Sequence, residues 1–250
     1  MKPVKIRQTI LGQGRPKIAV PLTAKTTSDL LVQAKEAKAL AEVIEWRIDF
    51  FESVLDFASL TTAAQQLREV IGEIPLLITF RTAKEGGAME ISEDKYFEIY
   101  EHVVTNKLAD ILDIELFQTT RKVKKMAILA DANDIKVIMS NHDFTKTPTV
   151  DEMIRRLELM ASYHADILKI AVMPNSVLDV LNLLTATQEV AARLDQPVIS
   201  MAMGDLGKLT RICGEVVGSC LTFGSVGQAS APGQIEAQSL KEILQALKVN

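Results

Sequence analysis

The chain has 250 residues, of which 48% are hydrophobic and 24% are charged, and its formal net charge is −4. This balance excludes a disordered chain and a collagen-like repeat, and an acidic chain without a long basic run is not expected to bind nucleic acid. Neither a membrane span nor a secretion signal is expected, because no long apolar stretch is present. The two cysteines, Cys213 and Cys220, are too few for a disulfide framework or a zinc site, which favours the cytoplasm.

Short apolar runs recur along the chain roughly every 30 residues, the spacing expected of strand–helix units. The predicted strands are 17–21, 43–49, 75–81, 110–116, 136–141, 166–172, 197–202 and 219–223. Capping side chains and apolar residues at helical spacing predict helices between them. These helices are 27–40, 92–106, 151–163, 176–194 and 235–247.

Eight such units favour an α/β fold with a closed (β/α)8 TIM barrel over an open doubly wound sheet. The open sheet would need a Gly-x-Gly-x-x-Gly turn after the first strand, and that turn is missing. Residues 1–16 predict an N-terminal β-hairpin that closes the bottom of the barrel. In this hairpin, 4–10 would pair with the chain from Lys17 on, across a turn at 12–14. Because no linker divides the chain, we expect residues 1–250 to form a single domain.

Several predicted strands carry charges, although buried parallel strands should be nearly all apolar. In the strand 43–49, for example, the charged side chains alternate with apolar ones and therefore share one face. The charges expected inside the barrel are Glu45, Arg47, Asp49, Arg81, Asp113, Glu115, His142 and Lys169. Buried charges must pair, and barrels carry their active sites at the C-terminal ends of the strands. We therefore expect an active site at that end.

Lys169 and His142 are the sharpest candidates for chemistry. A lysine is almost never buried without a partner, and two interpretations of Lys169 are open. Either its amine attacks a carbonyl to form an imine, or it makes a structural ion pair with Asp113 or Glu115. His142 lies at the end of a strand and is a candidate general base near neutral pH. The alternative is an ordinary hydrogen-bonded histidine.

Three further candidates lie in loops or in a short helix. Glu85 either orients a histidine or is a solvated loop charge. Arg211 either binds a carboxylate through two nitrogens or lies on the surface. The glycine-rich loop 223–234 is either a phosphate cradle built from backbone amides or a lid that supplies Ser230 and Gln234. No metal-binding motif stands out in the sequence.

Taken together, these segments resemble the type I 3-dehydroquinases. The matching pieces occur in the family's order and span nearly the whole chain. They are Glu45-Trp46-Arg47-Ile48-Asp49, Ile78-Thr79-Phe80-Arg81 with Glu85-Gly86-Gly87, Ser140-Asn141-His142-Asp143-Phe144, Lys169 in Leu-Lys-Ile-Ala, Met203-Gly204 with Arg211, and Ser230-Ala231-Pro232-Gly233-Gln234. The resemblance implies a (β/α)8 barrel that converts 3-dehydroquinate into 3-dehydroshikimate in the shikimate pathway. It also implies a cytoplasmic homodimer that needs no metal or external cofactor.

The resemblance further implies a role for each matching residue. Lys169 would form an imine with the substrate ketone, His142 would transfer the protons, and Glu85 would orient His142. Arg211 would bind the substrate carboxylate. The remaining substrate contacts would come from Glu45, Arg47, Arg81, Ser230 and Gln234. One departure is Pro21, where some members carry Ser, so one substrate hydrogen bond is expected to be missing or to come from the backbone.

Two other functions stay open at this point. A class I aldolase-like lyase would also place an imine-forming lysine on the sixth strand, but Arg211 and the loop 223–234 suit a carboxylate better than a sugar phosphate. A non-catalytic barrel that senses shikimate-type metabolites would need neither the imine chemistry of Lys169 nor the proton transfer of His142.

Overall fold

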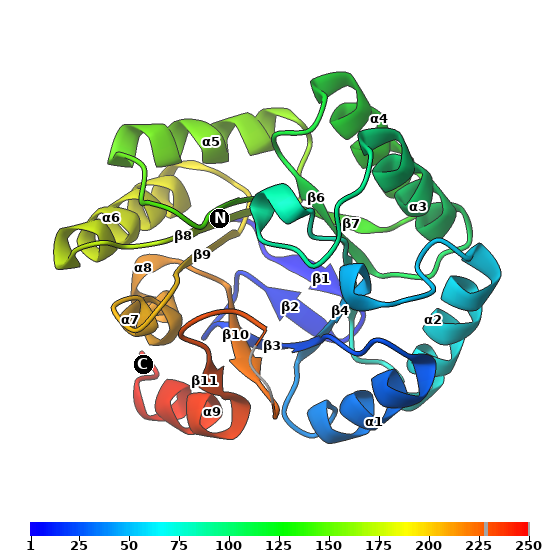
Figure 1. Ribbon diagram of the computed structural model, residues 1–250. Coiled ribbons are helices and arrows are strands. Elements are labelled where there is room, and N and C mark those ends of the chain that lie inside the picture. The colour runs from blue at the N-terminus through cyan, green and yellow to red at the C-terminus, as the bar shows by residue number, and fades with distance from the viewer. Residues whose placement is uncertain (228–229, 250) are drawn as a thin grey trace.

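A curled sheet of parallel strands surrounds a central axis in the computed structural model, and helices cover its outer face (Figure 1). The structure describes residues 1–227 and 230–249. Eight strands in this part of the chain match the eight that the sequence predicts. They are β3 (Lys17–Leu22), β4 (Val43–Arg47), β5 (Leu76–Thr79), β6 (Ile111–Glu115), β7 (Lys136–Asp143), β8 (Ile167–Val172), β9 (Val198–Ala202) and β10 (Leu221–Ser225). A short strand, β11 (Ile235–Glu236), pairs with β10.

The strands follow one another around the sheet in chain order from β3 to β9, and β10 pairs with β3. The sheet closes between β9 and β10 through an isolated bridge between Val198 and Ser219. The backbone N–H of Cys220 donates to the Val198 carbonyl at 2.8 Å, and the Ser219 hydroxyl accepts from the N–H of Ser200 at 3.1 Å. A side chain thus replaces part of the strand ladder at this junction. The expected (β/α)8 barrel is confirmed.

Helices fill the connections between the strands. They are α1 (Thr27–Ala37), α2 (Phe57–Ile71), α3 (Glu93–Thr105), α4 (Thr120–Asp131), α5 (Val150–Ser162), α6 (Val177–Arg193), α7 (Lys208–Ile212), α8 (Gly214–Val217) and α9 (Ala237–Ala246). Side-chain caps explain several starts: Ser92, Thr149 and Ser176 each accept a hydrogen bond from a backbone N–H of the first turn. Each described helix is too short or too polar to cross a lipid bilayer.

Alternation along the strands produces two apolar layers. On β8, the side chains of Leu168 and Ile170 pack outward against the helices, whereas Ile167 points into the barrel. Inward apolar residues in the first half of each strand fill the bottom of the barrel: Ala19, Val43, Leu77, Ile111, Ile138, Ile167, Ile199 and Leu221. The interior therefore becomes polar only toward the C-terminal ends of the strands.

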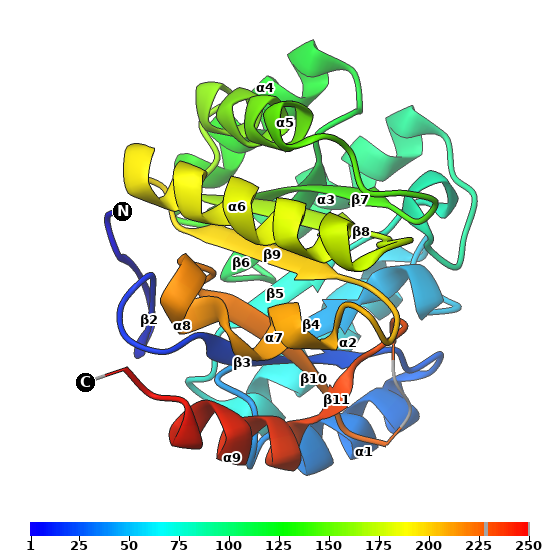
Figure 2. The same ribbon diagram turned by 90° about the vertical axis from the view of Figure 1, so that its left-hand side faces the viewer.

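An N-terminal hairpin closes the bottom of the barrel, as predicted, but its turn lies elsewhere. Strand β1 (Val4–Ile6) pairs antiparallel with β2 (Thr9–Leu11), so the turn falls at 7–8 and not at 12–14. Ile6 and Leu11 pack on the apolar bottom layer, and Figure 2 shows β2 at that end of the barrel. The predicted pairing of 4–10 with the chain from Lys17 on is wrong, because β4 and β10 already pair with the two edges of β3.

Candidate active site

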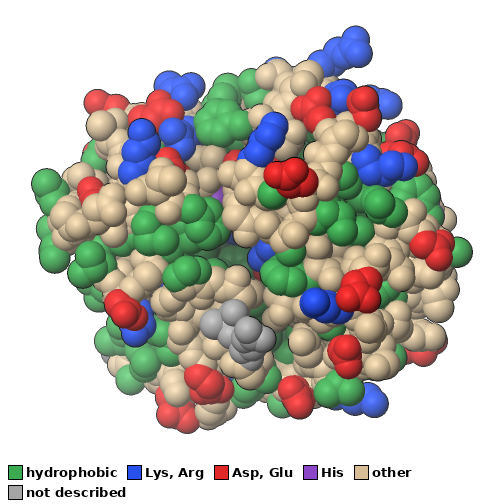
Figure 3. Space-filling model, viewed as in Figure 1, with side chains coloured by type: hydrophobic (Ala, Val, Ile, Leu, Met, Phe, Trp, Pro, Cys, Tyr) green, Lys and Arg blue, Asp and Glu red, His purple; other side chains and the backbone are tan. Residues whose placement is uncertain are grey.

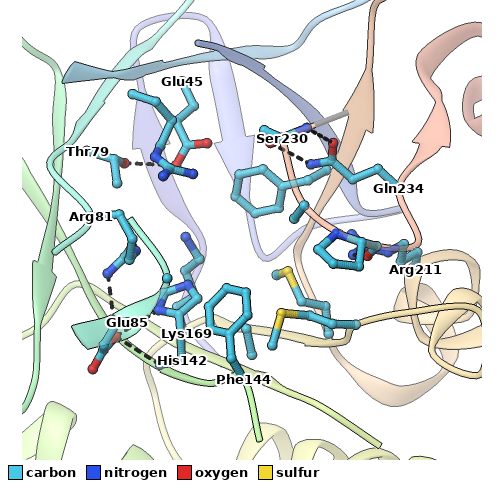
Figure 4. A pocket seen from close by; sticks show the side chains of 18 residues that line it. Glu45, Thr79, Arg81, Glu85, His142, Phe144, Lys169, Arg211, Ser230 and Gln234 are labelled. Carbon is cyan, nitrogen blue, oxygen red and sulfur yellow. Dashed lines mark hydrogen bonds and ion pairs between the residues drawn. The ribbon is translucent and has the colours of Figure 1, made fainter. Parts of the chain in front are cut away.

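A cavity of about 220 Å³ opens at the C-terminal ends of the strands. It appears as the hollow in the centre of the face in Figure 3, and its lining is drawn in Figure 4. The structure brings together all nine residues that the sequence singles out for the site. They are Glu45, Arg47, Arg81, Glu85, His142, Lys169, Arg211, Ser230 and Gln234. They come from β4, the segment directly after β5, a 3-10 turn η2 (Ala83–Glu85), β7, β8, α7 and the loop 223–234.

Lys169 points from β8 into the cavity, and its side chain is almost fully buried. Its Nζ atom lies 2.8 Å from Oδ2 of Asp113 and 4.8 Å from the centre of the Phe223 ring. The ion pair that the sequence left open is therefore present, and its partner is Asp113. Glu115, the other candidate partner, instead accepts from Arg81 Nη1 at 3.0 Å. The imine role of Lys169 stays a prediction.

Asp113 holds two cations in place from the centre of the barrel. Its Oδ2 accepts from Lys169, and its Oδ1 accepts from Arg81 Nη2 at 2.6 Å and from the Ser140 hydroxyl. Burial alone would raise the pKa of Asp113, but Arg81 and Lys169 outweigh it and hold that pKa well below the usual range. Asp113 is therefore a carboxylate at neutral pH, and it fixes the position of the Lys169 amine.

His142 and Glu85 form a buried pair beside Lys169. Oε2 of Glu85 lies 2.9 Å from Nδ1 of His142 and also accepts from the His142 backbone N–H at 2.9 Å. Oε1 of Glu85 accepts from Asn141 Nδ2 at 3.0 Å. Glu85 is 8% exposed, so the alternative of a solvated loop charge is wrong.

Burial changes the protonation of this pair. It lowers the pKa of His142 well below 6.5, and the nearby cations Arg81 and Lys169 lower it further. It raises the pKa of Glu85 to about 8, against the opposing effect of Arg81. At lower pH a proton bridges Oε2 and Nδ1 while Nε2 keeps its own proton. Loss of one proton near pH 8 leaves Nε2 unprotonated, so the pair can act as both acid and base.

Arg211 presents unused hydrogen-bond donors to the cavity. Its side chain is 2% exposed, so the alternative of a surface arginine is wrong. Nη2 donates to the Pro232 carbonyl at 3.1 Å, while Nε and Nη1 have no partner among the described residues. Burial lowers the pKa of Arg211 to about 10, which still leaves it charged at neutral pH. A buried guanidinium with two free donors suits a carboxylate ligand.

Glu45 and Arg47 point from β4 into the cavity, and each has a local partner. Oε1 of Glu45 accepts from the Thr79 hydroxyl at 2.8 Å. Arg47 donates Nε and Nη2 to the two oxygens of Asp49, both at 2.8 Å. Asp49 lies in a 3-10 turn, η1 (Ile48–Phe50), directly after β4. Glu45 therefore keeps acceptor capacity free for hydroxyl groups of a ligand.

The loop 223–234 covers one side of the cavity, and its residues 228–229 lie outside the described residues. Ser230 and Gln234 bond each other: the Ser230 N–H donates to Oε1 of Gln234 at 2.8 Å, and Nε2 of Gln234 donates to the Ser230 hydroxyl at 3.0 Å (Figure 4). Because the Ser230 amide is used within the loop, this arrangement favours the lid over a phosphate cradle.

Sequence reasoning missed several residues of the cavity. Thr79 follows the inward alternation of β5 and could have been found from it. The sequence carries no comparable signal for the apolar wall of the cavity, because methionine and aromatic side chains are equally common in an ordinary hydrophobic core. This wall consists of Phe144, Ala171, Met201, Met203 and Phe223. Pro21 pairs in register with Glu45 and is not among the lining residues. The substrate hydrogen bond expected to be missing there stays a prediction.

Comparison with known proteins gives one consistent family. The family model of type I 3-dehydroquinase matches residues 18–250. The chain is 49% identical to the 3-dehydroquinate dehydratase of Lactiplantibacillus plantarum over 248 residues, which cover 99% of this chain and 98% of that protein. It is 44% identical to the Enterococcus faecalis 3-dehydroquinate dehydratase over 252 residues, which cover 100% of both. The crystal structure of the type I 3-dehydroquinate dehydratase from Clostridium difficile, with covalently modified comenic acid, is 43% identical with a TM-score of 0.96, covering 99% of this chain and 98% of that one.

Proposed function

Because the chain belongs to the type I 3-dehydroquinase family, we propose that Lys169 forms an imine with the ketone of its substrate and that His142 then removes the adjacent proton. As a member of this family the chain is a hydro-lyase of the shikimate pathway, which removes water from 3-dehydroquinate to give 3-dehydroshikimate. The observation that carries the proposed mechanism is the common cavity in which the Lys169 amine lies beside the His142–Glu85 pair.

The Lys169 amine must lose a proton before it can attack. Asp113 is a poor acceptor, because its pKa is held well below the usual range. The His142–Glu85 pair, which exchanges a proton near pH 8, is the better acceptor. The neutral amine then adds to the ketone carbon, and the ketone oxygen leaves as water when the imine forms.

The imine makes elimination possible. A protonated imine accepts the electron pair that remains when a proton leaves the neighbouring carbon, so it lowers the barrier to forming that carbanion. His142 takes this proton through Nε2 while Glu85 holds Nδ1. His142 then returns a proton to the departing hydroxyl, which leaves as water. Hydrolysis of the product imine consumes one water and frees Lys169, so the net reaction releases a single water.

The other residues would bind the substrate. Arg211 would hold the carboxylate with the two donors that have no partner in the described structure. Substrate hydroxyls would be held by Glu45, Arg47 and Arg81. Ser230 and Gln234 would close over the substrate and exclude water. No group of His, Cys, Asp and Glu side chains in the described residues is arranged to hold a metal ion.

Borohydride trapping tests the mechanism directly. The protein is incubated with 3-dehydroquinate and borohydride, and the intact mass and the modified peptide are measured. A reduced adduct on the peptide that contains Lys169 is expected, and Lys169→Ala should lose both the adduct and turnover while it stays folded. Tight binding without an adduct would instead favour the non-catalytic sensor. Appearance of the enone absorbance of the product separates dehydration from the carbon–carbon cleavage of an aldolase.

We also propose that the chain is one domain and that two copies associate in the cytoplasm. A single closed sheet runs through the chain from β3 to β10. Large apolar side chains are exposed on and near α6 and α7, the side shown at the left of Figure 3; they are Val177, Leu178, Leu181, Leu206 and Leu209. A second copy could cover this patch, and light scattering of Leu178→Lys beside the unmodified protein would test it. The unpaired Cys213 and Cys220 suit a reducing compartment.

A further inference from the structure

The carboxylate of Glu85 has a second attachment besides His142, and it leads out of the cavity to a helix. Asn141 lies on β7 between two inward residues, so its own side chain starts on the helix-facing side of the strand. It is 3% exposed. Its Nδ2 lies 3.0 Å from Oε1 of Glu85, and its Oδ1 accepts from Nη1 of Arg156 at 2.7 Å. Arg156 belongs to α5 and is itself held by Oε1 of Glu152 at 2.7 Å.

Arg156 determines which way the Asn141 amide faces. A guanidinium only donates hydrogen bonds, so the amide oxygen must face Arg156 and the amide nitrogen must face Glu85. Without Arg156, the amide could turn and place its oxygen against Oε1 of Glu85. Two acceptors would then face each other inside the protein, which costs free energy. The orientation of the amide is thus set from α5, outside the barrel.

The Asn141 bond also completes the hold on the Glu85 carboxylate. Oε2 bonds both the backbone N–H and Nδ1 of His142, and Arg81 Nη1 approaches the same oxygen at 3.6 Å. Oε1 is bonded by Asn141 alone among the described residues. Because both carboxylate oxygens are bonded, the carboxylate cannot rotate away from the imidazole.

We propose that Asn141 and Arg156 are positioning residues that hold Glu85 in the orientation in which it bonds Nδ1 of His142. This inference rests on the proposed role of His142 as the base. Neither residue touches the reacting atoms: Asn141 and Arg156 are not among the residues that line the cavity. Their effect on turnover passes through Glu85 and should therefore appear in kcat and in its pH dependence.

The test measures kcat and KM against pH for Asn141→Ala and Arg156→Met. Asn141→Ala removes a donor that favours the ionised form of Glu85. We expect kcat to fall about 10-fold, KM to change less than about 2-fold, and the rising limb of the kcat profile to move about one pH unit upward. Arg156→Met should act in the same direction but less strongly. Arg156→Lys keeps a donor for the amide oxygen and should restore most of the loss.

Asn141→Ala leaves every charge around the pair unchanged, so its shift can be assigned to Asn141. The groups that face Glu85 or His142 are Arg47 on β4, Arg81 just after β5, Asp113 and Glu115 on β6, and Lys169 on β8. Arg155→Met is the matched control. Arg155 bonds the same Glu152 at 2.7 Å and 2.9 Å, but its side chain is 57% exposed and it makes no bond to Asn141.

Folding and function are separated by two further measurements. Thermal unfolding shows whether each variant is folded, and Asn141→Asp supplies a second substitution that fits the site. It can still accept from Arg156 but cannot donate to Glu85, so it should lower kcat at least as much as Asn141→Ala. If His142→Ala retains turnover, the proposed function fails. If His142→Ala is inactive while folded Asn141→Ala keeps the original kcat and pH profile, the positioning inference alone is overturned.

Discussion

The Lys169 amine and the Asp113 carboxylate form a buried ion pair of 2.8 Å at the centre of the site. Asp113 also accepts from Arg81, so a single carboxylate separates two buried cations. We therefore expect Asp113 to contribute to the stability of the fold, whereas Lys169 carries the proposed chemistry.

Asp113→Asn is expected to lower the free energy of unfolding by about 3 kcal/mol, because it leaves Lys169 without its buried counter-charge and leaves Arg81 with Glu115 as its remaining close partner. The pKa of Asp113 lies well below the usual carboxyl range, so its stabilisation is present at neutral pH. It should diminish only as the pH falls below about 4. Urea unfolding at pH 7 and pH 4 measures the effect. The exposed Asp131→Asn is the control, and equal stability of the two variants would contradict the prediction.

Glu85 should destabilise the fold as the pH rises. Its folded-state pKa of about 8 is above the ordinary value of 4.5, so its stabilising contribution is present at low pH and disappears as the pH passes 8. Relative to Glu85→Gln, the unmodified protein should lose about 1 kcal/mol of unfolding free energy between pH 7 and pH 9. His142 does not interfere, because its lowered pKa keeps it neutral in this range. Glu90→Gln, at an exposed position, should show no such slope.

Arg211→Met should weaken substrate binding and stabilise the free protein. Losing a buried guanidinium that would hold the carboxylate should raise KM about 100-fold. The same change removes a charge whose burial lowers its pKa from 12.5 to about 10, so unfolding should cost about 2 kcal/mol more. Lys208→Met, an exposed change on the same helix, is the control for both measurements. If the variant is less stable and keeps its KM, Arg211 is not an unpaired guanidinium that binds the substrate carboxylate.

Gly233→Ala should disturb the lid without disturbing the barrel. Gly233 has a φ of 74°, and a Cβ atom there would lie 2.2 Å from the carbonyl oxygen of Gly204. The neighbouring Pro232 carbonyl, which accepts from Arg211, would have to move. We expect KM to rise about 10-fold with little change in the melting temperature. Gly227→Ala has a similar φ of 69°, but no atom of the described residues lies within 4 Å of the added Cβ, so it controls for backbone strain.

The sequence by itself determined the barrel and the content of its site. Alternation within each strand assigns every side chain to the helices or to the interior, which is why Glu45, Arg81 and Lys169 could be placed in one cavity without coordinates. The spacing of apolar runs likewise located all eight barrel strands, because parallel strands buried on both faces need such runs. The N-terminal turn was misplaced, at 12–14, and the start of the predicted helix 235–247 is the short strand β11.

The tertiary structure decided which of these inward groups meet. Alternation fixes the face of a side chain but not its height, which depends on how far neighbouring strands are staggered. In β6 and β7, Glu115 pairs in register with Ser140, and Ser140 pairs with Lys169 of β8. Lys169 nevertheless bonds Asp113, the inward residue that precedes Glu115 on β6. The burial of Arg211 and the link from Arg156 through Asn141 to Glu85 also depend on how loops and helices fold over the strand ends, which local sequence patterns do not encode.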